Sequence, residues 1–328
     1  MGSCSQVDCS DVLEAAARLR SVLPRTPLVY SPARSVWLKL ESLQVTGAYK
    51  VRGALNAVLA GGERGDQRSV VAASAGNHGA GVAWAARYVG VQAVVAVPVD
   101  APQVKVDRIE ALGARVHRVG DSFEASLRWA RSHARQTDAR LIHAFDDPDV
   151  IAGQGTIALE LLHLCPDVVM VPIGGGGLAA GISLVLRGEG IRLVGVQVKG
   201  VDAMASVFRG GPRQISPAVT VADGVRVRSP GRLTQALCRI GLDDILLVTE
   251  RQVCEAMVSL REREGLLVEG AGAVASAAIP QVVGDRVIAL VTGSNVSPDC
   301  VDRMGAEFGR DPLLNKKSEP SSQNKSLF

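Results

Sequence analysis

The stretch VVMVPIGGGGLAAGISLVL, residues 168–186, joins an apolar run to a glycine-rich loop and a second apolar run. A continuous Val/Ile/Leu run predicts a β-strand that is buried on both faces, as in a parallel sheet covered by helices. The strand passes to a helix that begins near Leu178 through four glycines, Gly174, Gly175, Gly176 and Gly177. Consecutive backbone N–H groups at a helix N-terminus suit a phosphate. The loop has neither dinucleotide GxGxxG spacing nor the Lys-Ser/Thr of a P-loop, and a flexible turn is the alternative.

Apolar strand-like runs alternate with helical patterns along most of the chain, which predicts an α/β fold with doubly wound parallel sheets. Ligands in such sheets bind outside the carboxyl ends of the strands, so the strand-to-helix loops matter most. The expected strands are Val36–Leu40, Val70–Ala73, Ala93–Val97, Arg115–Val119, Val168–Pro172, Leu193–Gln197, Ile245–Val248 and Val287–Val291. The expected helices include one from an N-cap at Ser10 to Pro24, and Val51–Ala60, Ala80–Tyr88 and Gln103–Leu112.

The composition argues against some classes of protein. Of the 328 residues, 47% are hydrophobic, only 3% are aromatic, and the formal net charge is +3. Scattered cations with few aromatics argue against a nucleic-acid partner. The six cysteines form no CxxC pair, so we expect reduced thiols and a cytoplasmic protein. The sequence shows neither a signal peptide nor an apolar run long enough for a membrane span.

Two further loops carry reactive side chains. In TGAYK, residues 46–50, Lys50 opens a helix, where partial positive charge and partial burial would favour its uncharged amine. A solvated helix lysine is the alternative. In SAGNHG, residues 74–79, a hydroxyl, a carboxamide and glycines follow a strand and would suit a carboxylate. An N-cap with turn glycines is equally compatible, and His78 taken alone is more typical of a packed histidine.

The ordered set of loops resembles the fold-type II pyridoxal-phosphate enzymes, particularly threonine dehydratases and serine racemases, over about residues 20–310. Other matching stretches are Leu38–Gln44, Ile151–Thr156, Ala222–Val225, Glu269–Ala273 and Thr292–Asn295. The resemblance implies a fold similar to the tryptophan synthase β-subunit, with two doubly wound parallel-sheet domains. The large domain would comprise residues 1–65 and 146–311, the small domain residues 66–145, and residues 312–328 would form a flexible tail. A homodimer is also implied.

The resemblance assigns roles to individual residues. Lys50 would carry pyridoxal 5'-phosphate as a Schiff base, Asn77 would contact the ring hydroxyl, and Thr292 would face the pyridine nitrogen. The amides of Gly174, Gly175, Gly176, Gly177 and Leu178 would hold the phosphate. A small amino-acid substrate would place its carboxylate against Ser74, Ala75, Gly76, Asn77 and His78. Lys50 would then remove the Cα proton, the β-hydroxyl would leave, and a 2-oxo acid and ammonia would result.

Several alternatives remain open on the sequence. Ala75 stands where serine racemases carry a serine, which favours elimination over racemisation; a β-replacement synthase, or a catalytically silent binding protein, is a further alternative. L-Threonine and L-serine are the default substrates, and a bulkier β-hydroxy amino acid such as 3-hydroxyaspartate stays open. Glycines at 79, 81, 270 and 272 could open space for such a side chain. Related enzymes often bind a divalent metal through a glutamate at the position of Gln197. Because this chain has Gln197 there, with Lys199 close by, no strong divalent-metal site is expected.

Overall fold

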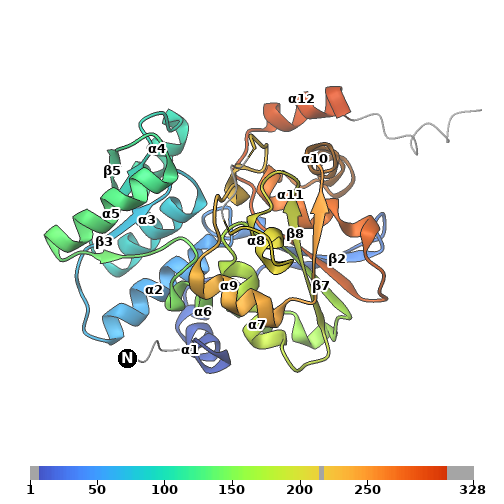
Figure 1. Ribbon diagram of the computed structural model, residues 1–328, viewed down its shortest axis with the longest axis horizontal. Helices are drawn as coiled ribbons and strands as arrows, with labels where there is room; N and C mark the ends of the chain where they lie inside the picture. The colour runs from blue at the N-terminus through green and yellow to red at the C-terminus, as the bar shows by residue number, and fades with distance from the viewer. Residues whose placement is uncertain (1–6, 214–217, 309–328) are drawn as a thin grey trace, which may run out of the picture.

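The structure, a computed structural model, describes residues 7–213 and 218–308, which form two α/β units on separate sheets (Figure 1). We call them the six-stranded unit and the four-stranded unit. The four-stranded unit runs from strand β3 to strand β6 and appears at the left of Figure 1. Its strands are β3 (Val70–Ala73), β4 (Ala93–Val97), β5 (Arg115–Arg118) and β6 (Arg140–Leu141). They pair in parallel in the order β5-β4-β3-β6.

The six-stranded sheet has the order β1-β2-β10-β7-β8-β9. All neighbours pair in parallel except β1, which pairs antiparallel with β2. Its strands are β1 (Leu28–Ser31), β2 (Val36–Leu40), β7 (Val168–Pro172), β8 (Arg192–Val198), β9 (Asp244–Val248) and β10 (Val287–Val291). Every residue of β7 and β10 is buried, as their unbroken apolar sequence predicts.

Helices cover both sheets. They are α1 (Cys9–Leu19), α2 (Lys50–Glu63), α3 (Asn77–Val89), α4 (Gln103–Ala111), α5 (Phe123–Thr137), α6 (Pro148–Leu159), α7 (Gly177–Leu186), α8 (Ala203–Phe208), α9 (Arg232–Gly241), α10 (Glu250–Glu264), α11 (Gly270–Ala277) and α12 (Pro298–Phe308). Short 3-10 helices are η1 (Glu41–Leu43), η2 (Leu162–Leu164), η3 (Asp223–Val225) and η4 (Ile279–Gln281). None of the helices in the described ranges has the length and hydropathy needed to cross a bilayer.

Helices α2 and α6 connect the two units and lie between them in Figure 1. They approach closely because glycines face each other: a Cβ on Gly153 would lie 2.6 Å from the Cα of Gly53. The chain enters the four-stranded unit after α2 and returns to the six-stranded unit through α6. Lys50, at the start of α2, meets the segment at residues 143–147, which precedes α6, at the boundary between the two units. All four strands of the smaller unit fall within residues 66–145, and the domain boundaries themselves stay a prediction.

Some local predictions were wrong. Helix α1 is capped by Asp8, whose carboxylate accepts the N–H groups of Ser10 and Asp11, and the helix ends at Leu19, well before Pro24. Strand β1 was not predicted, because its residues are largely exposed and lack a strict alternation. The predicted tail at residues 312–328 lies outside the described residues.

The glycines that were expected to open space near the substrate instead permit close packing. A Cβ on Gly79 would collide with the carbonyl oxygen of Ser74, and one on Gly81 would lie 3.3 Å from the backbone of Lys50. A Cβ on Gly270 or Gly272 would likewise collide with backbone oxygens. That expectation is therefore wrong, since these positions are filled by neighbouring backbone.

Candidate active site

The loop that leads to Lys50 is held by the carboxyl end of β10. The N–H of Tyr49 donates to the carbonyl oxygen of Thr292 at 3.1 Å, and the N–H of Ser294 donates to that of Gly47 at 2.9 Å. Gly47 has a φ of +64°, a left-handed conformation that glycine adopts without strain. The first residue of α2, Lys50, is therefore fixed against the end of the central strand of the larger sheet.

The Lys50 amine is partly buried at the boundary between the units. Its Nζ donates a hydrogen bond to the carbonyl oxygen of Ala144 at 2.9 Å. Burial lowers the pKa of Lys50 to about 8, so about a tenth of the amine is uncharged at about pH 7, far more than for a solvated lysine. Burial also lowers the pKa of His78 to about 3 and that of His143 to about 4, and both rings are neutral beside it.

The four glycines form a tightly enclosed turn at the start of α7. A Cβ on Gly175 would collide with the ring of Phe145, and one on Gly176 would lie 2.5 Å from Cε of Met204. Gly176 also has a φ of +97°. Because the first N–H groups of a helix have no acceptor within it, the amides at Gly177 and Leu178 are available to an anion.

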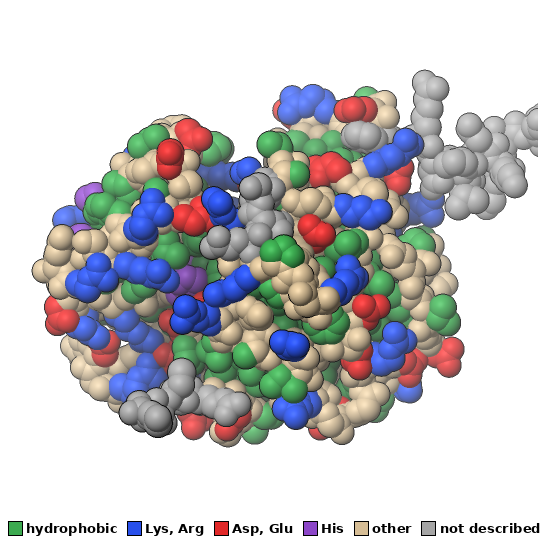
Figure 2. Space-filling model, viewed as in Figure 1, with side chains coloured by type: hydrophobic (Ala, Val, Ile, Leu, Met, Phe, Trp, Pro, Cys, Tyr) green, Lys and Arg blue, Asp and Glu red, His purple; other side chains and the backbone are tan. Residues whose placement is uncertain are grey.

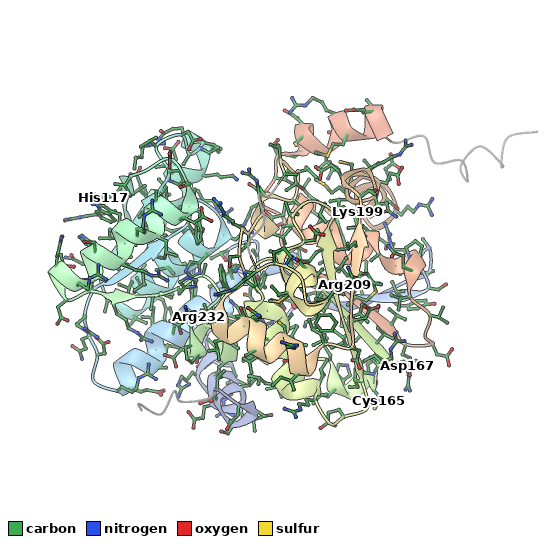
Figure 3. The ribbon with its side chains drawn as sticks, in the orientation of Figure 1. His117, Cys165, Asp167, Lys199, Arg209 and Arg232 are labelled. Carbon is green, nitrogen blue, oxygen red and sulfur yellow. The ribbon has the colours of Figure 1, made fainter. Side chains whose placement is uncertain are left out.

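The segment at residues 143–146 connects the lysine to this glycine loop. His143 Nδ1 accepts the N–H groups of Phe145 at 3.3 Å and Asp146 at 3.0 Å. The Asp146 carboxylate accepts three N–H groups at the start of α9, from Arg232, Leu233 and Thr234. Figure 3 labels Arg232 near the middle of the molecule, where the two units meet.

Helix α9 in turn fixes the glycine loop. The Thr234 hydroxyl donates to the carbonyl oxygen of Gly175 at 2.7 Å. On the other side, Gln197 ties the end of β7 to α8, because its Nε2 donates to Ile173 O at 3.1 Å and its Oε1 accepts the N–H of Ala205 at 2.7 Å. Gln197 therefore stabilises the packing of β7 and α8 through its side-chain hydrogen bonds. Within residues 7–213 and 218–308, no group of three or more His, Cys, Asp or Glu is arranged to hold a metal.

The loop at residues 74–77 faces the same boundary from the four-stranded unit. The N–H of Gly76 donates to Ser74 Oγ at 3.1 Å, and a Cβ on Gly76 would meet nothing closer than 3.9 Å. Ser74, Ala75 and Asn77 are partly buried and Gly76 is exposed. The open space at Gly76 and the start of α3 leave room for a small anion.

Asn77 belongs to a chain of polar side chains. Its Nδ2 donates to Glu269 Oε1 at 2.6 Å, and its Oδ1 accepts a hydrogen bond from Asn295. Burial raises the pKa of Glu269 to about 7, against the opposing effect of the hydrogen bond from Asn77. Glu269, the first residue of the matching stretch Glu269–Ala273, is thus in direct contact with Asn77.

Two of the predicted residues are engaged elsewhere through their side chains. The ring of His78 is buried, with Nε2 2.9 Å from the carbonyl oxygen of Ile142, so this side chain is held within the four-stranded unit. Thr292 is buried, and its hydroxyl donates to Ala271 O at 3.3 Å. Thr292 is nonetheless adjacent to the loop of Lys50 through its own carbonyl oxygen.

A network of buried ion pairs holds α2 in place through Arg52. Arg52 donates to both oxygens of Glu41 at 2.8 Å and to Glu160 at 2.7 Å. Lys39 donates to Glu160 at 2.5 Å. The side chains of Arg52 and Glu41 are only 3% and 0% exposed. The sequence does not reveal this network, because its members come from three separate segments, at residues 39–41, 52 and 160.

Comparison with protein families supports one assignment. Residues 19–293 match the family model described as pyridoxal-phosphate dependent enzyme. The L-threonine ammonia-lyase of Thermotoga maritima is 38% identical over 312 residues, which cover 91% of this chain and 78% of that protein.

Solved structures of two enzymes are also similar to this chain. Maize serine racemase superimposes with a TM-score of 0.86 at 31% identity, covering 92% of this chain and 98% of the racemase. A threonine deaminase from T.th. superimposes with a TM-score of 0.83 at 36% identity, covering 88% of this chain and 99% of the deaminase. The arrangement of the chain in two sheets is therefore shared with these structures.

Proposed function

The chain belongs to the family of pyridoxal-phosphate-dependent enzymes, and on that premise we propose that it is an ammonia-lyase acting on a small β-hydroxy amino acid such as L-threonine or L-serine. The product would be the corresponding 2-oxo acid with ammonia. The observation that carries the proposal is the partly buried Lys50 amine, whose pKa is lowered to about 8 and which is linked to the glycine loop through residues 144 and 145.

The residues of the site fit pyridoxal phosphate. The glycine loop is a cradle in which side chains at 174–177 would collide with Val225, Phe145 or Met204, which leaves backbone N–H groups to meet a phosphate. Lys50 is the amine that would condense with the cofactor aldehyde, and Asn77 would contact the ring hydroxyl. When bound, pyridoxal phosphate withdraws electrons from Cα of an amino acid and so makes its proton acidic.

Lys50 would take the Cα proton. Its amine has two properties that a general base needs at neutral pH: a lowered pKa, and an anchor at the carbonyl oxygen of Ala144 that sets its position. The neutral rings of His78 and His143 add no positive charge that would repel the proton from Nζ. The same amine would return to its covalent role when the product leaves.

The loop at Ser74–Asn77 would hold the substrate carboxylate. Its open backbone, the Ser74 hydroxyl and the N-terminus of α3 supply donors to an anion. Helices α2 and α6 would cover the opposite side of the site, because their facing glycines let the two helices approach closely.

Elimination is supported over racemisation by Ala75. A racemase needs a second proton donor on the face opposite the lysine, and a methyl group has none. The Thr292 hydroxyl, a neutral group, would face the pyridine nitrogen and would leave it largely unprotonated, which favours departure of the β-hydroxyl over return of a proton to Cα. A β-replacement synthase stays the other alternative within this family.

Product analysis tests the proposal. The purified enzyme with pyridoxal phosphate should convert L-threonine to 2-oxobutyrate and ammonia in equal amounts, and L-serine to pyruvate and ammonia. Formation of D-serine without ammonia would establish a racemase instead. Incorporation of an added thiol into the product would establish a β-replacement synthase.

We also propose that the enzyme works as a homodimer in the cytoplasm. The cytoplasmic assignment is supported by the cysteines of the described ranges, all of which are free thiols. The homodimer is supported by the resemblance in sequence, and light scattering on the purified chain would test it directly.

A further inference from the structure

Two cations of the four-stranded unit reach across the boundary to the six-stranded unit. Lys105 and Arg108 are three residues apart on α4 and therefore share one face of the helix. Lys105 forms an ion pair with Asp223 of η3. Arg108 Nη2 donates to the carbonyl oxygen of Thr46 at 2.6 Å. Both charges act on the carboxyl group of Glu269, which places them beside the candidate active site.

Lys105 and Arg108 differ in how their charges are balanced. The ion pair with Asp223 cancels the charge of Lys105. Arg108 is partly buried and burial lowers its pKa, while the charge of Glu269 acts in the opposite direction; in the described part of the chain no carboxylate lies within ion-pair distance of it. A guanidinium has five N–H donors, and Thr46 is the one acceptor found for them among residues 7–213 and 218–308. A partly buried cation that forms no direct ion pair is costly, and a bound anion would offset that cost.

The carbonyl oxygen of Thr46 has a second hydrogen-bond donor besides Arg108. Asn295 Nδ2 donates to the same oxygen at 3.2 Å and also to Asn77 Oδ1. Arg108 is thus linked to Asn77 through Thr46 and Asn295, in the polar chain that ends at Glu269. Asn77 is the residue at which the cofactor and the substrate carboxylate are proposed to meet, and the guanidinium is joined to it by these hydrogen bonds.

We propose, as a deepening of the β-elimination proposed above and resting on it, that Arg108 recognises a second carboxylate on the substrate. The preferred substrate class would be β-hydroxy amino acids with an acidic side chain, of which threo-3-hydroxyaspartate is the smallest. A planar guanidinium matches a carboxylate in a two-point hydrogen bond. Lys105 assists by cancelling the charge of Asp223, which would otherwise repel an anionic side chain.

The reaction balances for this substrate. Removal of the Cα proton and departure of the β-hydroxyl release one water and form the carbon–carbon double bond. The enamine product tautomerises to an imine, takes up one water and releases ammonia. The sum converts 3-hydroxyaspartate to oxaloacetate and ammonia, with no oxidant or reductant.

A comparison of two substrates of equal size tests the proposal. Steady-state kcat/KM of the holoenzyme is measured for threo-3-hydroxyaspartate and for its side-chain amide, threo-3-hydroxyasparagine, with L-threonine as the reference. We expect the wild type to prefer the acid over the amide by about 10- to 100-fold, the worth of a hydrogen-bonded charge. Arg108→Gln should bring this ratio close to one, and Arg108→Lys should keep part of it. The control Arg128→Gln, on the exposed face of α5, should leave the ratio as in the wild type.

The outcomes separate the two proposals. A wild-type ratio below about three, or a ratio that Arg108→Gln does not change, overturns the acidic substrate while L-threonine is still deaminated. If none of the three amino acids yields a 2-oxo acid with ammonia, the proposed function itself fails. A purely structural role of Arg108 would lower kcat/KM for all three substrates together and leave the ratio intact, which also overturns the proposal. The wild-type ratio decides the question even if a variant does not fold.

Discussion

The carbonyl oxygen of Ala144 accepts the hydrogen bond of the Lys50 amine at 2.9 Å, and the next residue places its ring against the glycine loop. One short segment, residues 143–146, thus touches the reactive amine, the glycine loop and the start of α9. This segment therefore connects the proposed base to the anion-binding loop through direct contacts with both.

Replacement of Lys50 by alanine should abolish covalent cofactor binding and lower the rate of 2-oxo acid formation by about 10³-fold or more, because the general base is lost with the amine. Absorbance of the bound cofactor and kcat with L-threonine measure both effects. Lys199→Ala is the matched control, since Lys199 is exposed on the six-stranded unit (Figure 3). An unchanged rate for Lys50→Ala would refute the assignment.

Reconstitution of the cofactor-free enzyme should depend on pH through Lys50. The uncharged amine is the reactive form, and burial lowers its pKa to about 8, so the second-order rate of pyridoxal-phosphate binding should rise with pH and level off above about 8. Stopped-flow absorbance from about pH 6 to about pH 10 would show the midpoint. A midpoint at the ordinary lysine value, above about 10, would mean that the amine is solvated in the free enzyme.

Gly175→Ala should weaken cofactor binding by about ten- to hundredfold, because the new Cβ would collide with the ring of Phe145 and would displace the loop. Equilibrium titration with pyridoxal phosphate measures this loss. Gly62→Ala, in α2, is the control: no atom lies within 4 Å of its added Cβ, and a helical alanine stabilises relative to glycine. Equal affinity of the two variants would contradict the role of the enclosed turn.

Arg52→Met should lower the free energy of unfolding by about 3–5 kcal/mol, since it leaves Glu41 buried without a counter-ion and leaves Glu160 with Lys39 alone. Urea denaturation of the holoenzyme measures the change. The control Arg251→Met removes an exposed pair with Glu255 on α10 and should have little effect. A similar stability of the two variants would show that the network is dispensable.

Glu269 should make stability depend on pH. Its pKa is raised by burial from 4.5 to about 7 in the folded protein, so folding favours the protonated form. The resulting stabilisation is fully present below about pH 4.5 and is lost as the pH rises through about 7. Glu269→Gln should flatten this part of the curve of unfolding free energy against pH. The curves of the two proteins should coincide in slope above about pH 8, and a slope that persists in the variant between about 5 and about 7 would assign the effect to another group.

Much of the fold follows from the sequence because buried parallel strands are continuous apolar runs. Val36–Leu40, Val70–Ala73, Ala93–Val97, Val168–Pro172 and Val287–Val291 have the bounds that their sequence predicts. Strand β1 lacked this signal because it is an exposed edge strand. The N-cap of α1 could not be chosen from sequence, since Asp8 and Ser10 are both good caps. The reciprocal bond between Asp8 and Asp11 decides it.

The residues of the site also fall into two groups, those that a local sequence pattern marks and those that it does not. Lys50, the glycine loop and Asn77 stand out because they occupy strand-to-helix loops, and each is local in sequence. The ion network of Arg52 and the position of Arg108 depend on contacts between segments more than 60 residues apart, such as Arg108 with Thr46. Neither position carries a local pattern that marks it. Figure 2 shows why charge alone is uninformative: cations and anions are interspersed over the visible surface, without a large area of one sign.

Strand β10 lies between β2 and β7 in the larger sheet, although it is the last of the strands in chain order. During synthesis the ribosome therefore makes Lys50, the glycine loop and the whole four-stranded unit before it makes the strand that joins the sheet and positions the lysine loop. Until residues 287–295 are made, β2 and β7 lack the strand that pairs with both of them in the folded sheet. A chain that ended before β10 would therefore lack the strand end whose backbone holds the loop in front of the reactive amine.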